Sequence, residues 1–341
     1  MTTFVKACSD LGVHISGSEL GPLELNKYDN EVDSVIVLKK DDVKKEVESG
    51  NKKRNIKYVN KFNKELYEKI VNTNDFVVTI GGDHAIAIGS SLGAKKKYKN
   101  IGLFWIDAHS DYHNMDSTIS GNLHGMPFAS VSFQNGNYLT SFYDDSYFDP
   151  KKTVLIGGRD IEDAEYINLE KAGVTVFTTE DIKKYGVKEI IDKAFQIVSG
   201  LRGVHISYDL DVIDPVIAPG VSVKASCGIN KEEAFEILEE LLKRKELITS
   251  FDLVEFNPLL DKDNKTKEIA EHILERVIKE KRAWNIRLFI FGSWDNNMYL
   301  FPLLLFWLFL FYIFYKALWL FHEHTNHFEK DQLLLLQMCN F

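Results

Sequence analysis

Short apolar runs alternate with charged, helix-period segments from about residue 30 to residue 280. Each apolar run has the length of one buried strand, and the segments between them repeat apolar residues with the period of a helix. This rhythm is typical of strand–helix–strand units, which build a parallel sheet covered by helices. The expected strands are Val35–Leu38, Phe76–Ile80, Ile101–Ile106, Val154–Gly157, Val174–Phe177, Gly203–Asp209 and Ser250–Phe256.

The helix-period segments include Tyr58–Val71, Ile182–Val198 and Lys231–Glu246. Asn230 precedes the last of these and Glu233 follows three residues on, which predicts a capped helix start. A further helix, ending at about Lys281, would close the domain.

Charge and cysteine content exclude several classes of protein. The 41 Lys and Arg against 50 Asp and Glu give a net charge of −9, which argues against a nucleic-acid partner. Three widely spaced cysteines, Cys8, Cys227 and Cys339, indicate neither a disulfide framework nor a thiolate zinc site. The N-terminus reaches Lys6 and Asp10 before any long apolar run, so no signal peptide is expected. A cytoplasmic protein is the resulting expectation.

Three polar clusters each follow a predicted strand directly: GGDH (81–84), DAHSD (107–111) and DLD (209–211). The carboxyl ends of parallel strands meet at one edge of a sheet, and alternate side chains of an extended segment face one side. Each cluster alone would be a turn or a helix cap. Together they predict a metal site whose ligands are His84, Asp107, His109, Asp111, Asp209 and Asp211.

Two divalent cations would cancel the charge of the four carboxylates in this set, which would otherwise repel one another and take up protons. Oxygen-rich ligands with two imidazoles and no thiolate favour Mn²⁺ over zinc or copper.

Four motifs resemble those of the ureohydrolases, the family of arginase, agmatinase and formimidoylglutamase: GGDHAIAIGS (81–90), WIDAHSDYH (105–113), SYDLDVIDP (207–215) and LVEFNP (253–258). The resemblance spans roughly residues 10–281. It implies a three-layer α/β/α sandwich around a mostly parallel eight-stranded sheet, and a homo-oligomer, usually a trimer or hexamer. It also implies a binuclear manganese centre that hydrolyses a guanidino or related C–N bond of a small molecule.

The resemblance assigns roles to individual residues. One Mn²⁺ would be held by His84, Asp107, Asp111 and Asp209, and the other by Asp107, His109, Asp209 and Asp211. Asp111 would also aim the attacking hydroxide, and Glu255 would pair with the substrate guanidinium. A carboxylate matches that planar fork with two hydrogen bonds.

The segment SGNLHGMP (120–127) resembles arginase more than its relatives. His124 there matches the histidine that gives a proton to the leaving amine. Thr118 and Ser120 fall where arginases bind the substrate α-carboxylate, and Glu162 and Glu165 fall near where the α-amino group is read. Between those glutamates and the preceding strand, Asp160 is expected to be a structural partner of Arg159 or of nearby backbone.

Two features depart from the arginase pattern. His113 stands where arginases commonly have Asn; it can still hydrogen-bond a carboxylate, but with a different charge and size. The loop VIAPGVSVKASCG (216–228) lacks the usual Gly-Thr-Pro stretch, and we expect its Lys224 to be solvated and its Cys227 to be packed.

Hydrolysis of L-arginine to L-ornithine and urea is therefore the leading hypothesis. Agmatinase, which needs no α-carboxylate site, is the alternative within the family. A non-catalytic, membrane-tethered binding protein with a ureohydrolase shell is the alternative from another class.

The chain beyond the catalytic domain, residues 284–341, has no counterpart in the family. Met298–Tyr315 is a run of eighteen residues without a formal charge, which as a helix would reach roughly 27 Å, enough to cross a bilayer. A transmembrane helix over about 298–321 would leave the catalytic domain, residues 1–283, on the cytoplasmic side, since basic residues precede it. An incidental extension is the alternative.

Overall fold

The computed structural model describes residues 2–27, 32–37 and 55–291, and residues 1–284 form one compact unit. Within these ranges, no helix combines the length and the apolar character that a membrane span requires. The segment expected to cross a membrane, residues 298–321, lies outside the described residues.

Eight strands of the described chain form one sheet in the order β2-β1-β3-β8-β7-β4-β5-β6, and every neighbouring pair is parallel. The strands are β1 (Thr2–Cys8), β2 (Val32–Val37), β3 (Phe76–Gly81), β4 (Ile101–Ile106), β5 (Thr153–Gly158), β6 (Thr175–Thr178), β7 (Gly203–Asp209) and β8 (Ile248–Val254). Seven of them were expected. β1 was missed because Lys6, which is buried, interrupts its short apolar run.

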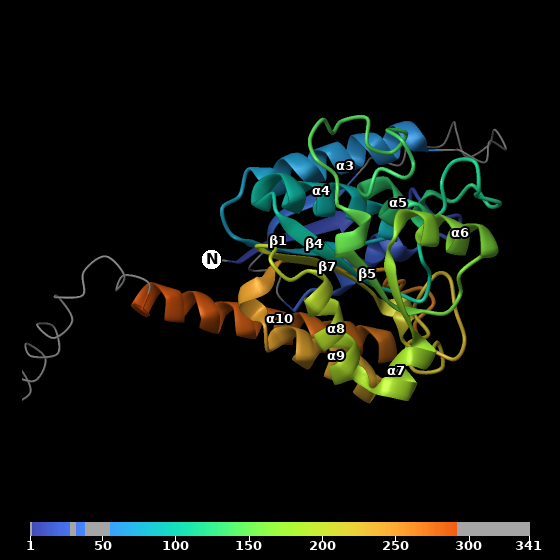
Figure 1. Ribbon diagram of the computed structural model, residues 1–341. Coiled ribbons are helices and arrows are strands. Elements are labelled where there is room, and N and C mark those ends of the chain that lie inside the picture. Colours follow the sequence, from blue (N-terminus) through green and yellow to red (C-terminus); the bar gives the residue numbers. More distant parts are fainter. Residues whose placement is uncertain (1, 28–31, 38–54, 292–341) are drawn as a thin grey trace, which may run out of the picture. The chain divides into compact units, whose positions relative to one another are not determined.

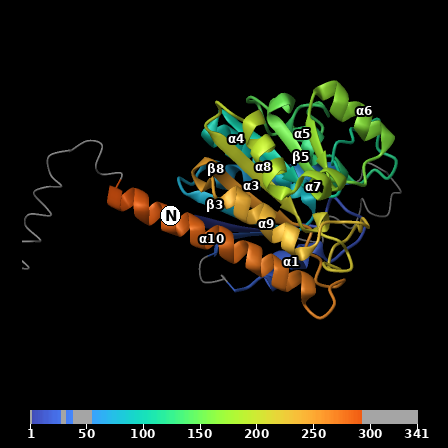
Figure 2. The ribbon, with the colours of Figure 1, turned by 60° about the horizontal axis from the view of Figure 1, so that its bottom comes forward.

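Helices cover both faces of this sheet, as Figures 1 and 2 show, so the predicted three-layer α/β/α architecture is confirmed. One face carries α3 (Ile56–Val71), α4 (Ala87–Tyr98), α5 (Pro127–Val131) and α6 (Asp163–Ala172), and the other carries α7 (Thr179–Tyr185), α8 (Val187–Ile197), α9 (Lys231–Leu242) and α10 (Lys265–Phe291). A short helix, α1 (Gly21–Glu24), follows β1.

Each central strand sends alternate side chains into two separate cores. Leu103 and Trp105 of β4 pack with the residues of α3, α4 and α5, whereas Phe104 and Ile106 pack with those of α8, α9 and α10. All four side chains are fully buried. Burial on both faces explains why the strands read as continuous apolar runs rather than as alternating ones.

Two predicted helix details are resolved by backbone geometry. The segment expected as one helix over Ile182–Val198 is two helices, α7 and α8, because Gly186 between them has φ 84°, which a helix interior does not allow. The capped start of α9 is confirmed: Asn230 and Glu233 each accept the other's backbone N–H at 2.8 Å.

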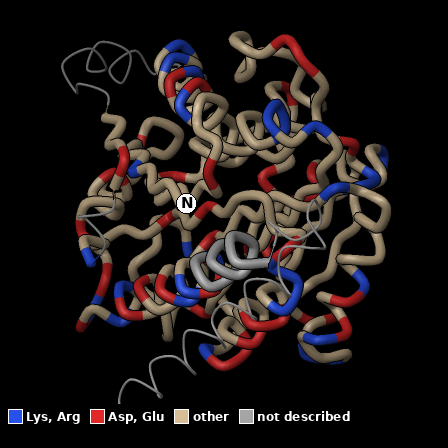
Figure 3. The backbone as a smooth tube through the Cα atoms, turned by 90° about the vertical axis from the view of Figure 1, so that its left-hand side faces the viewer, with Lys and Arg blue, Asp and Glu red and all other residues tan. Residues whose placement is uncertain are grey.

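The strands that precede the three polar clusters, β3, β7 and β4, lie in the middle of the sheet together with β8, which precedes Glu255, in the order β3-β8-β7-β4. Their carboxyl ends therefore lie side by side. On the side of the described chain seen in Figure 3, Lys and Arg positions are interspersed with Asp and Glu positions along the outer elements.

Candidate metal centre

The strand register places the polar clusters at one level. Ile106 pairs with Tyr208 and Tyr208 pairs with Leu253, so the residues that follow, Asp107 and Asp209, emerge beside each other. Glu255 continues β8 at the same edge, where its N–H donates to Gly82 O at 2.8 Å. Side chains from four strands thus converge within a few residues of the strand ends.

The Gly-Gly pair after β3 brings the chain close to the end of β1. A Cβ on Gly82 would lie 2.0 Å from Ser9 O, so only glycine fits. Asp83 then turns away from the centre, since its carboxylate accepts the N–H groups of Ala85 at 2.8 Å and Gly12 at 3.0 Å. Asp83 is a structural cap, and His84 faces the other strand ends.

His84 Nδ1 lies at the middle of three carboxylates. It is 3.0 Å from Asp107 Oδ2, 3.0 Å from Asp209 Oδ2 and 3.1 Å from Asp111 Oδ2. Yet neither His84 Nδ1 nor Asp111 Oδ2, both buried, has a hydrogen-bond partner among the described residues. Electron-pair donors that converge in this way without hydrogen bonds fit a cation as their common partner.

A second group of ligands adjoins the first. Atoms of Asp107, His109 and Asp211 lie within 4.8 Å of one another, as do those of His84, Asp107 and Asp111, so Asp107 belongs to both groups. His109 Nδ1 is 2.8 Å from Asp211 Oδ2 and 3.6 Å from Asp107 Oδ1. The arrangement has the donor set for two cations that share a carboxylate.

Neighbouring groups hold the first imidazole in one orientation. His84 Nε2 lies 2.9 Å from Ser207 Oγ, and its ring stacks on Trp105 with centroids 4.0 Å apart. Trp105 in turn donates its Nε1–H to Asp107 Oδ2 at 2.9 Å. The contact with Ser207 favours the proton on Nε2, which leaves the Nδ1 lone pair for a cation.

The structure corrects the expectation for Asp160. Its carboxylate lies 3.7 Å from His109 Nε2, so it faces the second imidazole, whereas the Arg159 guanidinium donates to backbone carbonyls. Only the Asp160 N–H has the expected backbone role, donating to Ala108 O at 3.0 Å.

Burial and mutual repulsion make the carboxylates costly in charged form. Burial, followed by the charges of Asp211 and Asp107, raises the pKa of Asp209 well above its ordinary value. Burial and the charge of Asp107 raise the pKa of Asp111 to about 7. Asp107 differs: burial would raise its pKa, but the adjacent imidazoles of His109 and His84 outweigh burial and lower it. Divalent cations would relieve the repulsion that remains.

Glu255 lies beside the ligand groups with one oxygen unused. Its Oε1 accepts the His84 N–H at 2.7 Å and lies 3.1 Å from His124 Nδ1. Its Oε2 is buried and has no hydrogen-bond partner within the described chain. The backbone has φ 67° at Glu255 and φ 50° at Asp111, a conformation that non-glycine residues seldom adopt and that tends to occur at functional sites.

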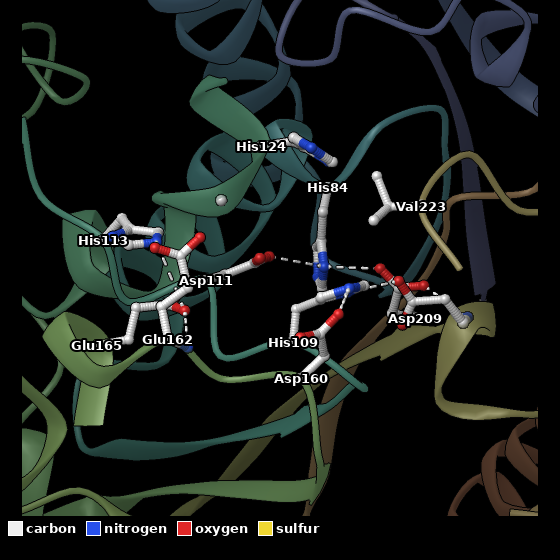
Figure 4. Close-up of a pocket in the computed structure, with 12 residues that line it drawn as sticks. His84, His109, Asp111, His113, His124, Asp160, Glu162, Glu165, Asp209 and Val223 are labelled. Carbon is white, nitrogen blue, oxygen red and sulfur yellow. Dashed lines mark hydrogen bonds and ion pairs between the residues drawn. The ribbon is translucent and has the colours of Figure 1, made fainter. Parts of the chain in front are cut away.

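A cavity opens onto these groups, and Figure 4 shows its lining. In this view His113, Glu162 and Glu165 lie on the left, Asp209 and Val223 lie on the right, and His109 lies between them. The lining residues are His84, His109, Asp111, His113, His124, Gly125, Asp160, Glu162, Glu165, Asp209, Asp211 and Val223.

Thr118 and Ser120 are not among the residues that line this cavity in the described chain. Their hydroxyls accept backbone N–H groups of the same loop, from Gly121 at 3.0 Å and from Asn122 at 3.2 Å. The structure therefore does not bring these two residues to the other site residues.

His113 bridges the two glutamates of the lining. Its Nε2 lies 3.4 Å from Glu162 Oε2 and 3.6 Å from Glu165 Oε2, and its Nδ1 lies 3.1 Å from Ser117 Oγ. Glu165 also accepts the N–H groups of Glu162 and Tyr112, each at 3.0 Å. Glu165 is therefore largely committed to local structure, whereas the half-exposed Glu162 carboxylate is accessible.

The loop after Asp214 contributes one residue that sequence reasoning missed. Val223 lines the cavity, and no signal marked it because an apolar residue in a loop carries no distinctive chemistry. Lys224 is exposed, as expected. Cys227 is also exposed, so the expectation that it packs was wrong; its φ of 64° belongs to a loop turn.

The fold and site together define a class: a three-layer α/β/α enzyme with a candidate carboxylate–imidazole metal centre at the carboxyl ends of its central strands. The sequence model of the arginase family matches residues 3–279, and the chain belongs to this family. Arginase from Bacillus subtilis (strain 168) is 33% identical over 281 residues, covering 81% of this chain and 88% of that protein. Arginase from Bacillus caldovelox is 32% identical over 294 residues, covering 80% and 96%.

Solved structures agree with this assignment. The native structure of arginase from Bacillus caldovelox superposes with a TM-score of 0.73 at 29% identity, covering 81% of this chain and 97% of that one. A hypothetical agmatinase from Burkholderia thailandensis, at 20% identity and a TM-score of 0.65, shares the fold.

Proposed function

We propose that this protein hydrolyses L-arginine to L-ornithine and urea with two Mn²⁺ ions in each subunit. One observation carries the proposal: two ligand groups that share Asp107 lie beside the unpaired Oε2 of Glu255 and the imidazole of His124. An acceptor for a guanidinium and a proton donor thus stand next to a metal centre.

The six metal-facing residues divide between two ions. His84, Asp107, Asp111 and Asp209 would hold one, and Asp107, His109, Asp209 and Asp211 the other. Residues that held two divalent cations in this way would make hydroxide available at neutral pH, because water beside such ions loses a proton far more readily than bulk water does. A guanidinium is a poor electrophile, so this nucleophile is required.

Glu255 and Asp111 position the reactants. Glu255 Oε1 is already engaged by the His84 N–H, and Oε2 is free to accept an N–H of the guanidinium. Asp111, which would hold one ion through Oδ2, also lines the cavity, where its carboxylate can accept from the attacking water and orient it toward the guanidinium carbon.

His124 supplies the proton that the leaving amine needs. Burial would lower its pKa, but the hydrogen bond and charge of Glu255, with the charges of Asp111 and Asp83, outweigh burial and raise it. A histidine whose protonated form is favoured beside the guanidinium site can act as the general acid.

The polar end of the cavity is suited to an amino acid. Glu162 and Glu165 offer negative charge to an α-ammonium group, and His113 lies between them with its ring facing both. Thr118 and Ser120 would contribute to the α-carboxylate only if their loop turned toward the cavity.

Urea release by Mn²⁺-loaded protein tests the proposal directly. With L-arginine and agmatine offered separately at equal concentration, we expect urea from arginine and much less from agmatine. Urea from agmatine alone would make the protein an agmatinase. No urea from either, by a folded protein that contains manganese, would favour a non-catalytic binding protein.

Assembly and location are also part of the proposal. We infer a homo-oligomer, a trimer or hexamer, which the molar mass from light scattering would test. The hypothesis that residues 298–321 anchor a cytoplasmic domain to a membrane is tested by fractionating cells that express the chain with and without residues 284–341. A full-length chain found only in the soluble fraction would exclude the anchor.

A further inference from the structure

Arg159 follows β5 and directs its guanidinium at four backbone carbonyls. It donates to Asp211 O at 2.7 Å, Val212 O at 2.8 Å, Ala225 O at 2.9 Å and Ser226 O at 3.1 Å. One side chain thus ties together two segments: the turn that carries the candidate ligand Asp211, and the loop that follows Val223. Arginine is charged at every relevant pH, and its donors have a fixed planar geometry.

The backbone at Arg159 is attached to a third segment. Its N–H donates to Ala108 O at 2.8 Å, and Asp160 and His109 form a parallel bridge. The Ala108 N–H donates to Asp211 Oδ1 at 3.2 Å. Arg159 therefore lies where the ends of β7, β4 and β5 meet, next to the group formed by Asp107, His109 and Asp211.

The loop fits closely around the guanidinium. A Cβ on Gly228 would lie 2.8 Å from Arg159 Nη2 and 2.4 Å from Asp214 N, so a larger residue would displace one of them. The Gly228 N–H also donates to Asp214 Oδ2 at 3.0 Å. Val223, in the same loop, faces the cavity in Figure 4. Movement of the guanidinium would thus disturb both a ligand turn and a cavity wall.

We propose that Arg159 is a positioning residue for the second cation subsite, formed by Asp107, His109 and Asp211. Its four hydrogen bonds hold the Asp211 turn against the loop 223–228, so that the Asp211 carboxylate remains beside His109. The first subsite, centred on His84, has no hydrogen bond to Arg159. The inference rests on the proposed two-metal function. It adds that binding of the second cation depends on the Arg159 side chain more than binding of the first does.

Manganese binding to the apoprotein tests the proposal. Arg159→Lys keeps the charge but loses the planar fork, and Arg159→Met loses both. Titration calorimetry should give two Mn²⁺ per subunit for wild type. In both variants we expect one ion to bind as in wild type and the other to bind about tenfold more weakly or worse, since groups that orient ligands have effects of that size. The methionine variant should bind this second ion more weakly than the lysine variant does.

Electron paramagnetic resonance provides the signature that a general loss of stability would not produce. At one added equivalent per subunit, Arg159→Lys should show mostly uncoupled Mn²⁺, and at two equivalents a smaller spin-coupled signal than wild type. Arg244→Lys is the matched control, because Arg244 pairs with Asp192 and lies over Phe195, away from the ligand groups. It should bind both ions normally.

Cleavage by trypsin after Lys224 reports on the loop independently of metal. Lys224 is exposed, and the adjacent Ala225 carbonyl is one of the Arg159 acceptors. We expect trypsin to cut this bond faster in the apo form of both Arg159 variants than in apo Arg244→Lys.

The outcomes separate the two proposals. If the folded Arg159 variants bind each of the two ions with the same affinity as wild type, the role of Arg159 is overturned and the two-metal function stays intact. An equal loss of both ions would overturn that role as well. Wild type that binds no manganese would overturn both. Unchanged cleavage after Lys224 would contradict the anchoring of the loop, even if a variant proved too unstable for titration.

Discussion

Glu255 Oε1 accepts the backbone N–H of His84 at 2.7 Å, although 171 positions separate the two residues in the sequence. The bond joins the end of β8 to the turn after β3. It places the carboxylate that we propose binds the substrate against the residue that faces three candidate metal-binding carboxylates. The proposed substrate site and the candidate metal centre therefore share one hydrogen bond.

Glu255→Gln should separate these two tasks. The amide oxygen can still accept the His84 N–H, so manganese content should stay at the wild-type level. The neutral amide cannot offset the guanidinium charge, and we expect kcat/KM for arginine to fall by about a hundredfold or more. Metal analysis and steady-state kinetics provide the check. Glu65→Gln, on the exposed side of α3, should behave as wild type. A Glu255→Gln enzyme of normal kcat/KM would contradict the assignment.

His124→Asn should change the pH profile as well as the rate. The pKa of His124 is raised because the hydrogen bond and charge of Glu255 outweigh the opposing effect of burial. A general acid works when protonated, so wild-type kcat should fall as pH rises through this raised pKa. The variant should lack that fall and have a kcat about 10² to 10⁴ lower. His272→Asn in α10 is the control. If kcat still falls with rising pH in His124→Asn, another group is responsible for that fall.

Asp209→Asn should melt at or above the wild-type temperature without metal and below it with manganese. Charge on Asp209 is costly, since burial and the charges of Asp211 and Asp107 raise its pKa. Without metal, the neutral asparagine should give a melting temperature equal to or above that of wild type. With manganese, wild type should melt higher, because a ligand that binds only the folded state adds about 2.7 kcal/mol at a hundredfold excess over its Kd.

Calorimetric scans of both proteins with chelator and with Mn²⁺ measure this crossing. If manganese raises the Tm of Asp209→Asn as much as it raises that of wild type, Asp209 is not a metal ligand. Asp75→Asn, at the far end of β3, controls for the loss of a negative charge.

Lys281 predicts a pH dependence outside the site. Its Nζ donates to Lys245 O and Ile248 O, each at 2.8 Å, and burial lowers its pKa to about 8. Below about pH 8 both the folded and unfolded chains hold this proton. Between about 8 and 10.4 the unfolded chain holds it and the folded chain does not, so stability rises with pH there.

Wild type should therefore gain up to about 3 kcal/mol in unfolding free energy relative to Lys281→Met between pH 8 and 10.4. Urea denaturation across this range gives the difference, and Lys279→Met, at an exposed position of α10, should show none of it. A difference that stays constant with pH would mean that the buried ammonium keeps its proton.

Much of the architecture was predictable because the buried strands are short, continuous apolar runs bounded by charged helices. Seven strands and the cap at Asn230 follow from local rules of this kind. β1 escaped them because Lys6 interrupts its apolar run, and pairing along its length with β3 overrides that local signal. The helix break at Gly186 was missed because the apolar period continues across it.

The sequence by itself determined which chemistry the chain can support: carboxylates and imidazoles placed directly after strands, in an order that a parallel sheet must bring to one edge. Only the tertiary structure decided how those groups meet. Asp83 turns away to cap a loop while its neighbour His84 points inward, and Asp160 faces His109 rather than Arg159. Thr118 and Ser120 close a turn instead of lining the cavity. The reason is that neighbouring residues in a loop have the same local propensities, and hydrogen bonds to distant strands select the direction each side chain takes.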